Sequence, residues 1–376
     1  MTDLVIVGAG LTGASLACAL KNAKLPITVI DAKPVPHSFE SFDRPIALNH
    51  RSKEILEKLG VWETLKNHAH PIKHILVSTQ GKFGKTRLHA EDQNVEALGY
   101  NILLSTLTQT LQKIMLTQNN VTLLAPMSLD RIEEKTLYCG EKKLEATIIV
   151  AADGTHSKVR ELLNIESTKT DYKETAIITT LELKNDHQHT AYERFTSQGT
   201  LALLPLGEKR MELIWVAPTE NAKKILEMDD ALFLKTIQDV FSNYVTFKKT
   251  TTRSSYPLIG LTTQRSVYND SIILLGNAAH TLHPIAAQGF NLALRNTQRL
   301  ADILMSDGKH TLSEYDHLQQ MTQNKTIGLT KLIHNIFTNR YPGSGSVQSI
   351  LLQAMDSCPL AKNQFTWQAM GYSNSQ

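Results

Sequence analysis

Cysteine is scarce in this sequence, and long apolar runs are absent from it. The three cysteines, Cys18, Cys139 and Cys358, are widely spaced and form no Cys-x-x-Cys pair. An odd and scattered set of this kind argues against a disulfide framework and against a zinc site. The apolar stretches 147–152 and 272–275 have the length of buried strands, well short of the roughly 20 residues that span a bilayer. We therefore expect a protein of the reducing cytoplasm, with no bound metal and no membrane span.

A concentration of charge of one sign is lacking as well. The chain carries 39 Lys and Arg against 36 Asp and Glu, a net charge of +3, and these residues are interspersed. Nucleic-acid binders usually present a basic patch or stripe, so we expect no nucleic-acid partner. The length of 376 residues, with 41% hydrophobic and 20% charged residues, is typical of globular protein folded into two or three packed domains around one active site.

A glycine-rich turn follows the first apolar segment. Residues 3–7 have the pattern of a buried strand, Gly8, Gly10 and Gly13 follow as Gly-x-Gly-x-x-Gly, and a helix pattern leads to a second strand that ends at Asp31. In such a unit the glycines allow a tight turn, approach of a pyrophosphate and close helix packing, and the acid accepts hydrogen bonds from ribose hydroxyls. The pattern predicts a dinucleotide site, with NAD and FAD both open, and contacts at Gly8, Ala9, Gly10, Thr12, Gly13 and Asp31.

Helix periodicity and buried-strand runs alternate over most of the chain, at 52–67, 104–115, 147–154, 272–280 and 288–305. This alternation predicts a parallel sheet covered by helices. Residues 171–257 instead show short alternating strands with one helix at 229–241, which predicts a mostly antiparallel sheet. Residues 71–90 are also strand-like, and the tail is predicted to be helical apart from a loop at 341–346.

Two later segments resemble a known flavoprotein group. AADGTHSKVR at 151–160 resembles the Asp-Gly motif of the class A flavoprotein monooxygenases, the para-hydroxybenzoate hydroxylase family, with Asp153 and Gly154 in the expected places. GNAAHTLHPIAAQGFNLALRN at 276–296 resembles the segment of that family in which a Gly-Asp pair holds the ribityl chain and a following helix start faces the flavin ring. The resemblance decides between the two dinucleotides and implies FAD.

The resemblance covers most of the chain and implies further cofactor contacts. DRPIALNHRS at 43–52 matches the Arg-x-x-Ala-Leu segment of the family, and YERFTSQGTLALLPL at 192–206 matches its substrate domain. The free N–H groups and dipole at the start of the helix would stabilise negative charge on the flavin. The additional flavin contacts implied in this way are Arg44, Asp153, Gly154, Gly276, Asn277, Ala278, Pro284, Gln288, Gly289, Phe290 and Asn291.

The fold class implied by the resemblance is α/β. It consists of a Rossmann-type FAD-binding domain with a parallel sheet, interleaved with a mostly antiparallel β substrate domain and followed by a helical C-terminal tail. The expected domains are a discontinuous FAD-binding domain at 1–70, 98–165 and 258–335, a substrate domain at 71–97 and 166–257, and a C-terminal segment at 336–376.

These motifs are most similar to those of the ubiquinone-biosynthesis hydroxylases, which implies an FAD-dependent monooxygenase that hydroxylates 2-polyprenyl-6-methoxyphenol. In this family NAD(P)H reduces FAD, O2 adds at the flavin C4a position, and the hydroperoxide delivers a hydroxyl group to the phenol ring. A second Gly-x-Gly-x-x-Gly motif is absent, which fits a reductant that docks transiently. His283 and Pro284 are the catalytic candidates, with His283 as a proton carrier, a steric wall or an ordinary loop residue.

Two apolar clusters bear on the substrate and on partners. The run LALLPL at 201–206 contains no Arg or Lys to pair with a benzoate carboxylate, which favours an apolar phenol and makes Leu204 and Pro205 substrate candidates. The alternative is that these residues are core. In the tail, apolar residues at helical spacing predict either internal packing or contact with the inner membrane face or another ubiquinone-biosynthesis protein. This tail cluster consists of Leu332, Ile333, Ile336 and Phe337, beside Lys331 and Arg340.

Two alternatives stay open, and departures from the family pattern bear on the second, the structural subunit. Asn277 replaces the more usual Asp, Ala287 stands where Gly is usual, and Leu104 and Ser105 replace an Asn-Arg pair that touches flavin. One alternative is an FAD oxidoreductase of the same fold, such as a prenyl reductase, which oxidises NAD(P)H without incorporating oxygen. The other is a flavin-poor structural subunit of a ubiquinone-biosynthesis complex.

Overall fold

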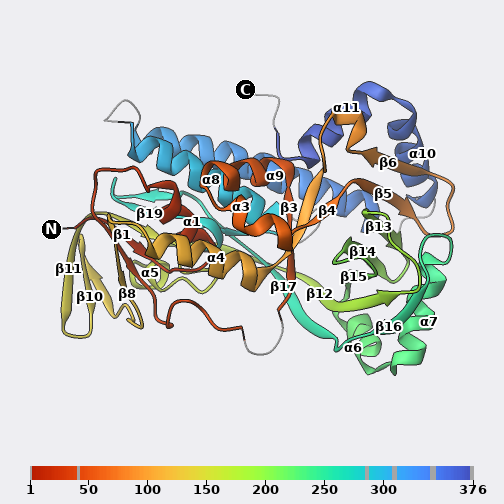
Figure 1. Ribbon diagram of the computed structural model, residues 1–376, viewed down its shortest axis with the longest axis horizontal. Coiled ribbons are helices and arrows are strands. Elements are labelled where there is room, and N and C mark those ends of the chain that lie inside the picture. The colour runs from red at the N-terminus through yellow and green to blue at the C-terminus, as the bar shows by residue number, and fades with distance from the viewer. Residues whose placement is uncertain (1, 40–42, 284–287, 307–310, 339–343, 373–376) are drawn as a thin grey trace.

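The computed structural model describes residues 2–39, 43–283, 288–306, 311–338 and 344–372. In these residues the strands form an eight-stranded sheet, a nine-stranded sheet and a small three-stranded sheet between them. Helices gather on one side of the first sheet and around the far end of the second (Figure 1). Among the residues of these ranges, no helix is long and apolar enough to cross a bilayer.

The eight-stranded sheet has the strand order β18-β19-β11-β1-β2-β8. The five strands from β19 to β8 are mutually parallel, β18 pairs antiparallel with β19 at one edge, and the hairpin β9–β10 pairs with the first part of β11. Parallel strands covered on both faces are rich in Val and Ile, and β2 is buried at all four residues. The bounds are β1 Thr2–Val7, β2 Ile27–Ile30, β8 Val121–Leu124, β9 Arg131–Glu133, β10 Thr136–Cys139, β11 Lys142–Ala151, β18 Val267–Tyr268 and β19 Ile272–Leu274.

One face of this sheet packs against long helices, whose apolar stripes form a continuous core with Leu4, Ile6 and Val29. The other face packs against the hairpin and a short helix around Val5 and Ile149. The bounds are α1 Leu11–Ala19, α2 His50–Lys58, α3 Trp62–Leu65, α4 Leu104–Leu116, α5 Lys158–Leu162, α8 Gln288–Leu304 and α9 Leu312–Thr338, with 3-10 turns η1 Lys66–His68, η2 Glu91–Gln93 and η3 Gly276–Ala278.

The nine-stranded sheet has the order β20-β17-β12-β15-β14-β13-β5-β6, with β16 beside β12. All pairs are antiparallel except β13 with β5. The small sheet has the order β3-β7-β4 and is antiparallel. The bounds are β3 Pro45–Asn49, β4 His70–Ile72, β5 His74–Thr79, β6 Lys85–His89, β7 Gly99–Leu103, β12 Ser167–Leu183, β13 Thr190–Thr196, β14 Gly199–Pro205, β15 Arg210–Pro218, β16 Phe247–Thr250, β17 Ser254–Thr263 and β20 His280–Thr281.

One face of the nine-stranded sheet is covered by α6 (Thr219–Glu227) and α7 (Asp230–Phe241). Alternate residues of β15 are buried against these helices, with Trp215 fully enclosed. The helix at 229–241 is confirmed as α7, whereas α6 is an additional helix that the sequence analysis did not identify. The opposite face of this sheet is turned toward the small sheet, where the Asn101 amide of β7 donates to the Pro205 carbonyl of β14 at 3.1 Å.

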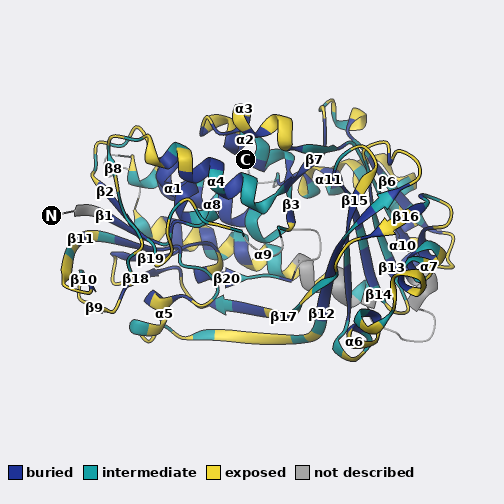
Figure 2. Ribbon diagram, turned by 60° about the horizontal axis from the view of Figure 1, so that its bottom comes forward, coloured by how far each residue is buried: buried dark blue, intermediate teal, exposed yellow. Residues whose placement is uncertain are grey.

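The strands β12 and β17 connect the two large sheets, as Figure 2 shows, and β12 is mostly exposed over its first eight residues and mostly buried beyond them. Their pairing shifts register between Asp171 and Thr175, and Lys173 has a φ of 57° there. A bulge of this kind bends a strand and redirects its side chains. Tyr172 and Glu174, on either side of Lys173, both contact His283.

The C-terminal tail folds back onto the hairpin β5–β6. Helix α10 (Ser344–Ser357) packs there and is followed by α11 (Pro359–Ala369). The predicted loop at 341–346 is therefore wrong for residues 344–346, while 341–343 lie outside the described residues. Ser and Gly are tolerated in the first turn of a helix, because the first N–H groups need no helical acceptor.

Two backbone contacts fix α10 on the hairpin. The Thr86 hydroxyl donates to the Leu352 carbonyl at 2.8 Å. The Asp356 carboxylate accepts the backbone N–H of Arg87 at 2.8 Å and its guanidinium at 2.9 Å. A Cβ on Gly84 would lie 2.0 Å from the Ser349 carbonyl oxygen, so the helix approaches the hairpin as closely as glycine permits.

We expect Asp356→Ala to release α10 from the hairpin. Losing hydrogen bonds to a charged group removes about 1.5–3 kcal/mol, which raises the rate of proteolysis within 344–357 roughly tenfold or more through local opening. Asp356→Asn, which keeps an oxygen that accepts the Arg87 N–H, is the matched control and should be cleaved more slowly than the alanine variant. Equal cleavage of Asp356→Ala and the natural chain would contradict this role.

Candidate functional site

The glycine turn lies between β1 and α1, at the carboxyl edge of the parallel sheet. Gly8 has a φ of 102°, and a Cβ there would lie 2.6 Å from the carbonyl oxygen of Ala152. A Cβ on Gly13 would lie 1.8 Å from the Gly8 carbonyl oxygen, whereas one on Gly10 would meet nothing within 4 Å. Gly8 and Gly13 thus serve internal packing, and Gly10 leaves open backbone at the start of α1, where a helix favours an anion.

Asp31 lies at the end of β2, next to this turn. Its carboxylate accepts the Ala9 N–H at 2.6 Å and the Lys33 N–H at 2.8 Å, and the His37 ring lies 3.3 Å away. Burial alone would raise the pKa of Asp31, but hydrogen bonds from His37, Lys33 and Ala9 outweigh it, so the pKa is lowered. The carboxylate is therefore ionised and able to accept hydrogen bonds from ribose hydroxyls. The Ala9 N–H is already used within the protein.

The Asp-Gly segment follows β11, the neighbour of β1. Gly154 has a φ of 85°, and the Asp153 carboxylate accepts the Val159 N–H at 3.1 Å. The second carboxylate oxygen of Asp153 is buried and has no hydrogen-bond partner among the described residues. An unsatisfied buried acceptor is costly unless a ligand completes it. Asp153 is thus suited to accept from a cofactor hydroxyl.

The third segment of the site follows β19, the neighbour of β11. Gly276 has a φ of 61°, and a Cβ there would lie 2.6 Å from the Thr12 hydroxyl. Asn277 is exposed, while Ala278 is buried. The Arg160 guanidinium donates to the carbonyls of Ala278 at 2.8 Å and Thr155 at 2.6 Å, which joins the second and third segments. In the sequence, Arg160 is only a motif residue, and its role as this clamp carries no separate signal.

Helix α8 begins at Gln288 beside this edge. Gln288, Gly289 and Phe290 are half-buried, and a Cβ on Gly289 would meet nothing within 4 Å. Pro284 and Ala287 lie outside the described residues. Among the described residues, none would contact a Cβ on Gly289, as at Gly10 in α1.

The predicted cofactor residue Asn291 has a structural role inside the protein. Its side-chain oxygen accepts the Asn49 N–H at 3.0 Å and the Ser52 hydroxyl at 2.7 Å, and its amide donates to the Ala47 carbonyl at 3.0 Å. These bonds hold α8 against β3 and α2. A flavin contact of Asn291 stays a prediction, and Ser52 is a site-supporting residue that the sequence analysis missed.

His283 lies just before the undescribed segment, where the bulge of β12 approaches. Its Nε2 atom lies 3.0 Å from the Glu174 carboxylate, and its ring packs edge-on against Tyr172 at 4.8 Å between centroids. The His283 side chain is only 1% exposed. The sequence singled out His283, but Glu174 and Tyr172 come from a strand more than 100 residues earlier and have no motif of their own.

His280 lies nearby on β20 and is fully enclosed. Neither of its ring nitrogens has a hydrogen-bond partner in the described part of the chain. Burial lowers its pKa to about 4, so the ring is neutral at physiological pH.

The predicted substrate residues lie on β14, where alternate residues point to opposite faces. Leu201 and Leu203 are fully buried against the helices, so these two are core, as the alternative interpretation held. Leu204 lies on the opposite face and is half-buried, and the Pro205 carbonyl accepts from the Asn101 amide at 3.1 Å. Arg44 precedes β3 on the same side, with its guanidinium 5.7 Å from the centre of the Tyr256 ring.

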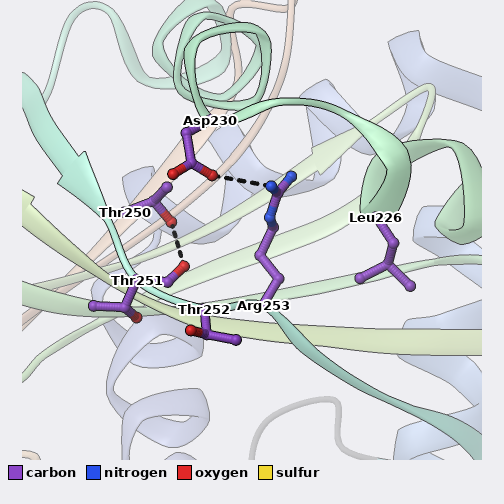
Figure 3. Close-up of a pocket in the computed structure, with 6 residues that line it drawn as sticks. All are labelled: Leu226, Asp230, Thr250, Thr251, Thr252 and Arg253. Carbon is purple, nitrogen blue, oxygen red and sulfur yellow. Dashed lines mark hydrogen bonds and ion pairs between the residues drawn. The ribbon is translucent and has the colours of Figure 1, made fainter.

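A polar pocket lies apart from this edge, beside α6, α7 and β16 (Figure 3). It has a volume of about 500 Å3 and is lined by Leu226, Asp230, Arg253 and the threonines 250–252. The Arg253 guanidinium donates to the Met228 carbonyl at 2.6 Å and pairs with Asp230 at 3.0 Å. The Arg253 guanidinium thus caps the carboxyl end of α6, so the residues that line this pocket have a structural role.

Comparisons with known proteins agree with the geometry. The family described as FAD binding domain matches residues 1–316. Ubiquinone hydroxylase UbiM of Neisseria meningitidis is 26% identical to this chain over 98% of it and 85% of its own length. The 3-demethoxyubiquinol 3-hydroxylase of Escherichia coli is 27% identical over 98% of both chains.

Solved structures share the fold. The p-nitrophenol 4-monooxygenase PnpA of Pseudomonas putida superposes with a TM-score of 0.79 at 14% identity, over 98% of each chain. PqsL of Pseudomonas aeruginosa, in complex with 2-aminobenzoylacetate, superposes with a TM-score of 0.73 at 20% identity, over 96% of this chain and 99% of the other. The predicted fold class is confirmed, while the predicted domain limits and site residues stay predictions.

We expect an alanine substitution to have different effects at Gly10, which has room for a methyl group, and at Gly13, which has none. Gly10→Ala adds a methyl group where the protein leaves room and φ is −68°. We expect it to fold normally and to bind FAD at least tenfold more weakly, because the methyl stands where a pyrophosphate approaches the backbone. Gly13→Ala should instead lower the melting temperature of the apoprotein. Flavin content and thermal unfolding measure the two effects, and normal FAD affinity of Gly10→Ala would contradict the assignment.

Buried His280 predicts a loss of stability in acid. Its pKa of about 4 lies below the ordinary 6.5, so between these values the unfolded chain binds a proton that the folded chain does not. Stability is therefore lost as pH falls from 6.5 to 4, by up to about 3 kcal/mol. His280→Phe, which cannot titrate, should be less sensitive to pH over this window in urea unfolding. An unchanged pH dependence would count against this burial.

Proposed function

This chain belongs to the FAD binding domain family and is an FAD-dependent monooxygenase, and we propose that it hydroxylates the ring of a polyprenylated phenol in ubiquinone biosynthesis. The finer proposal is 2-polyprenyl-6-methoxyphenol as substrate, as for 2-octaprenyl-6-methoxyphenol hydroxylase. The observation that carries the proposal is the likeness to ubiquinone hydroxylases, which extends over 98% of this chain. The half-buried, apolar position of Leu204 on the face opposite the helices supports a hydrocarbon-rich substrate.

FAD is the cofactor, and the edge of the parallel sheet fits it. We propose that Gly10 and the start of α1 receive its pyrophosphate, that Asp31 holds the ribose hydroxyls, and that Asp153 and Asn277 accept or donate hydrogen bonds along the ribityl chain. The orphaned oxygen of Asp153 and the open backbone at Gly10 support these roles. Bound FAD supplies the transfer of electrons from NAD(P)H and the activation of O2.

The chain itself must orient the phenol and keep water out. We propose that the buried pair of His283 and Glu174 acts here. Glu174 fixes the orientation of the ring, since its carboxylate lies 3.0 Å from Nε2. The imidazole, fixed in this way, then serves as the proton carrier. Pro284, the second catalytic candidate, lies outside the described residues.

The tail combines internal packing with exposed apolar side chains. Phe337 stacks on Phe195 at 4.0 Å between ring centroids, which agrees with internal packing. Leu332 is 55% exposed, Ile350 is 61% exposed and Leu360 is 83% exposed. We propose that this end of a cytoplasmic protein touches the inner membrane face or another ubiquinone-biosynthesis protein where the lipid substrate is delivered.

The function is tested by supplying a 2-polyprenyl-6-methoxyphenol, NAD(P)H and isotopically labelled O2 to the yellow holoprotein. We expect one labelled oxygen atom in the ring, and accumulation of the same phenol in cells that lack the gene. NAD(P)H oxidation with a reduced prenyl chain and no labelled product would favour the reductase. A colourless protein that cannot be reconstituted with FAD would favour the structural subunit.

A further inference from the structure

A buried carboxylate lies on the open face of the nine-stranded sheet. Met211, Leu213 and Trp215 of β15 are fully buried against α6 and α7. Glu212 therefore points to the opposite face, because side chains alternate along a strand. Its neighbour in the β14 register is Leu204, the predicted substrate residue, and its neighbour in β12 is Thr180.

Glu212 lies beside groups from three other elements. The Asn101 amide of β7 lies 3.4 Å from one carboxylate oxygen of Glu212 and donates to the Pro205 carbonyl at 3.1 Å. The charged and titratable groups that face Glu212 are Arg44, before β3, and Tyr256, on β17. Arg44 is exposed and Leu204 is half-buried. Glu212 itself is 1% exposed.

Two buried acceptor oxygens of this cluster accept no hydrogen bond from the described residues. The Oε1 atom of Glu212 and the Oδ1 atom of Asn101 are buried without a hydrogen-bond partner in the described residues. Burial of such atoms is costly, and a ligand that donates a hydrogen bond removes the cost. A ring hydroxyl is such a donor, whereas a methoxy group or a carboxylate is not.

We propose that Glu212 binds the hydroxyl group of the phenol substrate and accepts its proton during hydroxylation, with Asn101 orienting the carboxylate. This inference rests on the proposed function and adds the residue that activates the ring. In the step, the phenol O–H bond breaks, the proton moves to Oε1 of Glu212, and the electron pair stays on the phenol. The ring then carries more electron density at its ortho and para carbons, where the oxygen atom supplied through the monooxygenase reaction is added.

The basicity of Glu212 suits this step. Burial raises its pKa to about 8, against the lowering effects of Asn101 and Arg44. A carboxylate of that basicity is much closer to a phenol, with a pKa of about 10, than an ordinary glutamate is. The group accepts a proton only when ionised, so hydroxylation should increase with pH up to about 8 and level off above it.

The same face carries a second acidic group. Glu193 of β13 pairs in register with Ala202, and Ala202 and Leu204 lie on one face of β14. Burial raises the pKa of Glu193 to about 7. Once both carboxyl groups are ionised, above a pH of about 8, they disfavour a benzoate, since like charges near each other are unfavourable. In that state the face favours a neutral phenol.

The first experiment measures binding, without turnover, to the FAD-loaded enzyme. The probes are 2-prenylphenol and its methyl ether, which differ by one hydrogen-bond donor, and calorimetry gives their affinities. We expect the enzyme to prefer the phenol at least tenfold. The preference should collapse in Glu212→Met, which has similar volume and no acceptor. Glu208→Gln, which alters an exposed carboxylate in the turn before β15, should keep it.

The second experiment separates proton transfer from a purely structural role. Glu212→Gln should reduce hydroxylation about 100-fold or more, abolish its rise with pH, and leave NAD(P)H oxidation running with release of hydrogen peroxide. Glu212→Asp should keep part of the rate and the rise with pH. This variant set still decides the matter if Glu212→Met fails to fold.

The outcomes distinguish a failure of the role of Glu212 from a failure of the proposed function. If the enzyme hydroxylates the phenol and Glu212→Gln keeps both its rate and its pH profile, Glu212 is not the proton acceptor and the proposed function stands. If Glu212→Met keeps the preference for the phenol over its ether, Glu212 does not bind the hydroxyl group. If the natural chain neither binds nor hydroxylates a prenylated phenol, both proposals are overturned.

Discussion

The structure depends on one steric constraint at the carboxyl edge of the parallel sheet. Three neighbouring strands, β1, β11 and β19, end there, and the segments that leave them meet without room for side chains. A Cβ on Gly8 would lie 2.6 Å from the Ala152 carbonyl, and one on Gly276 would lie 2.6 Å from Thr12. Arg160 then holds two of the three segments through backbone carbonyls. The cofactor edge is therefore preorganised by internal contacts.

A second set of contacts joins this edge to the nine-stranded sheet. The strands β12 and β17 extend from one sheet to the other, and the bulge of β12 brings Glu174 to His283. Asn291 fixes the start of α8 to β3, next to the segment that carries Arg44. The carboxyl edge of the parallel sheet, His283 and the nine-stranded sheet are thus joined through these contacts, which limits their relative movement.

The features that the sequence predicted are those that depend on residues close together in the chain. The turn at Gly8, the strand that ends at Ala151 and the helix that begins at Gln288 carry local periodicity and short motifs. The sequence did not predict contacts that join distant segments, such as Arg160 with Ala278 or Glu174 with His283, because no spacing rule connects such residues. Glu212 was missed for the same reason. A single acidic residue in an apolar strand is expected to face solvent, and only the contacts with distant segments show that Glu212 is buried. The loop expected at 341–346 failed in part because Ser and Gly also suit the first turn of a helix.

The strand order has a consequence for the synthesis of the chain. β1 is complete within the first seven residues, but it pairs with β11, which is not finished until Ala151. At about 5–20 residues per second, a ribosome needs roughly 7 to 30 s to add the intervening residues. During that interval the apolar strand LVIV can pair with β2 only. The nascent protein therefore exposes an unpaired edge of β1, the strand that leads into the glycine turn, until β11 emerges.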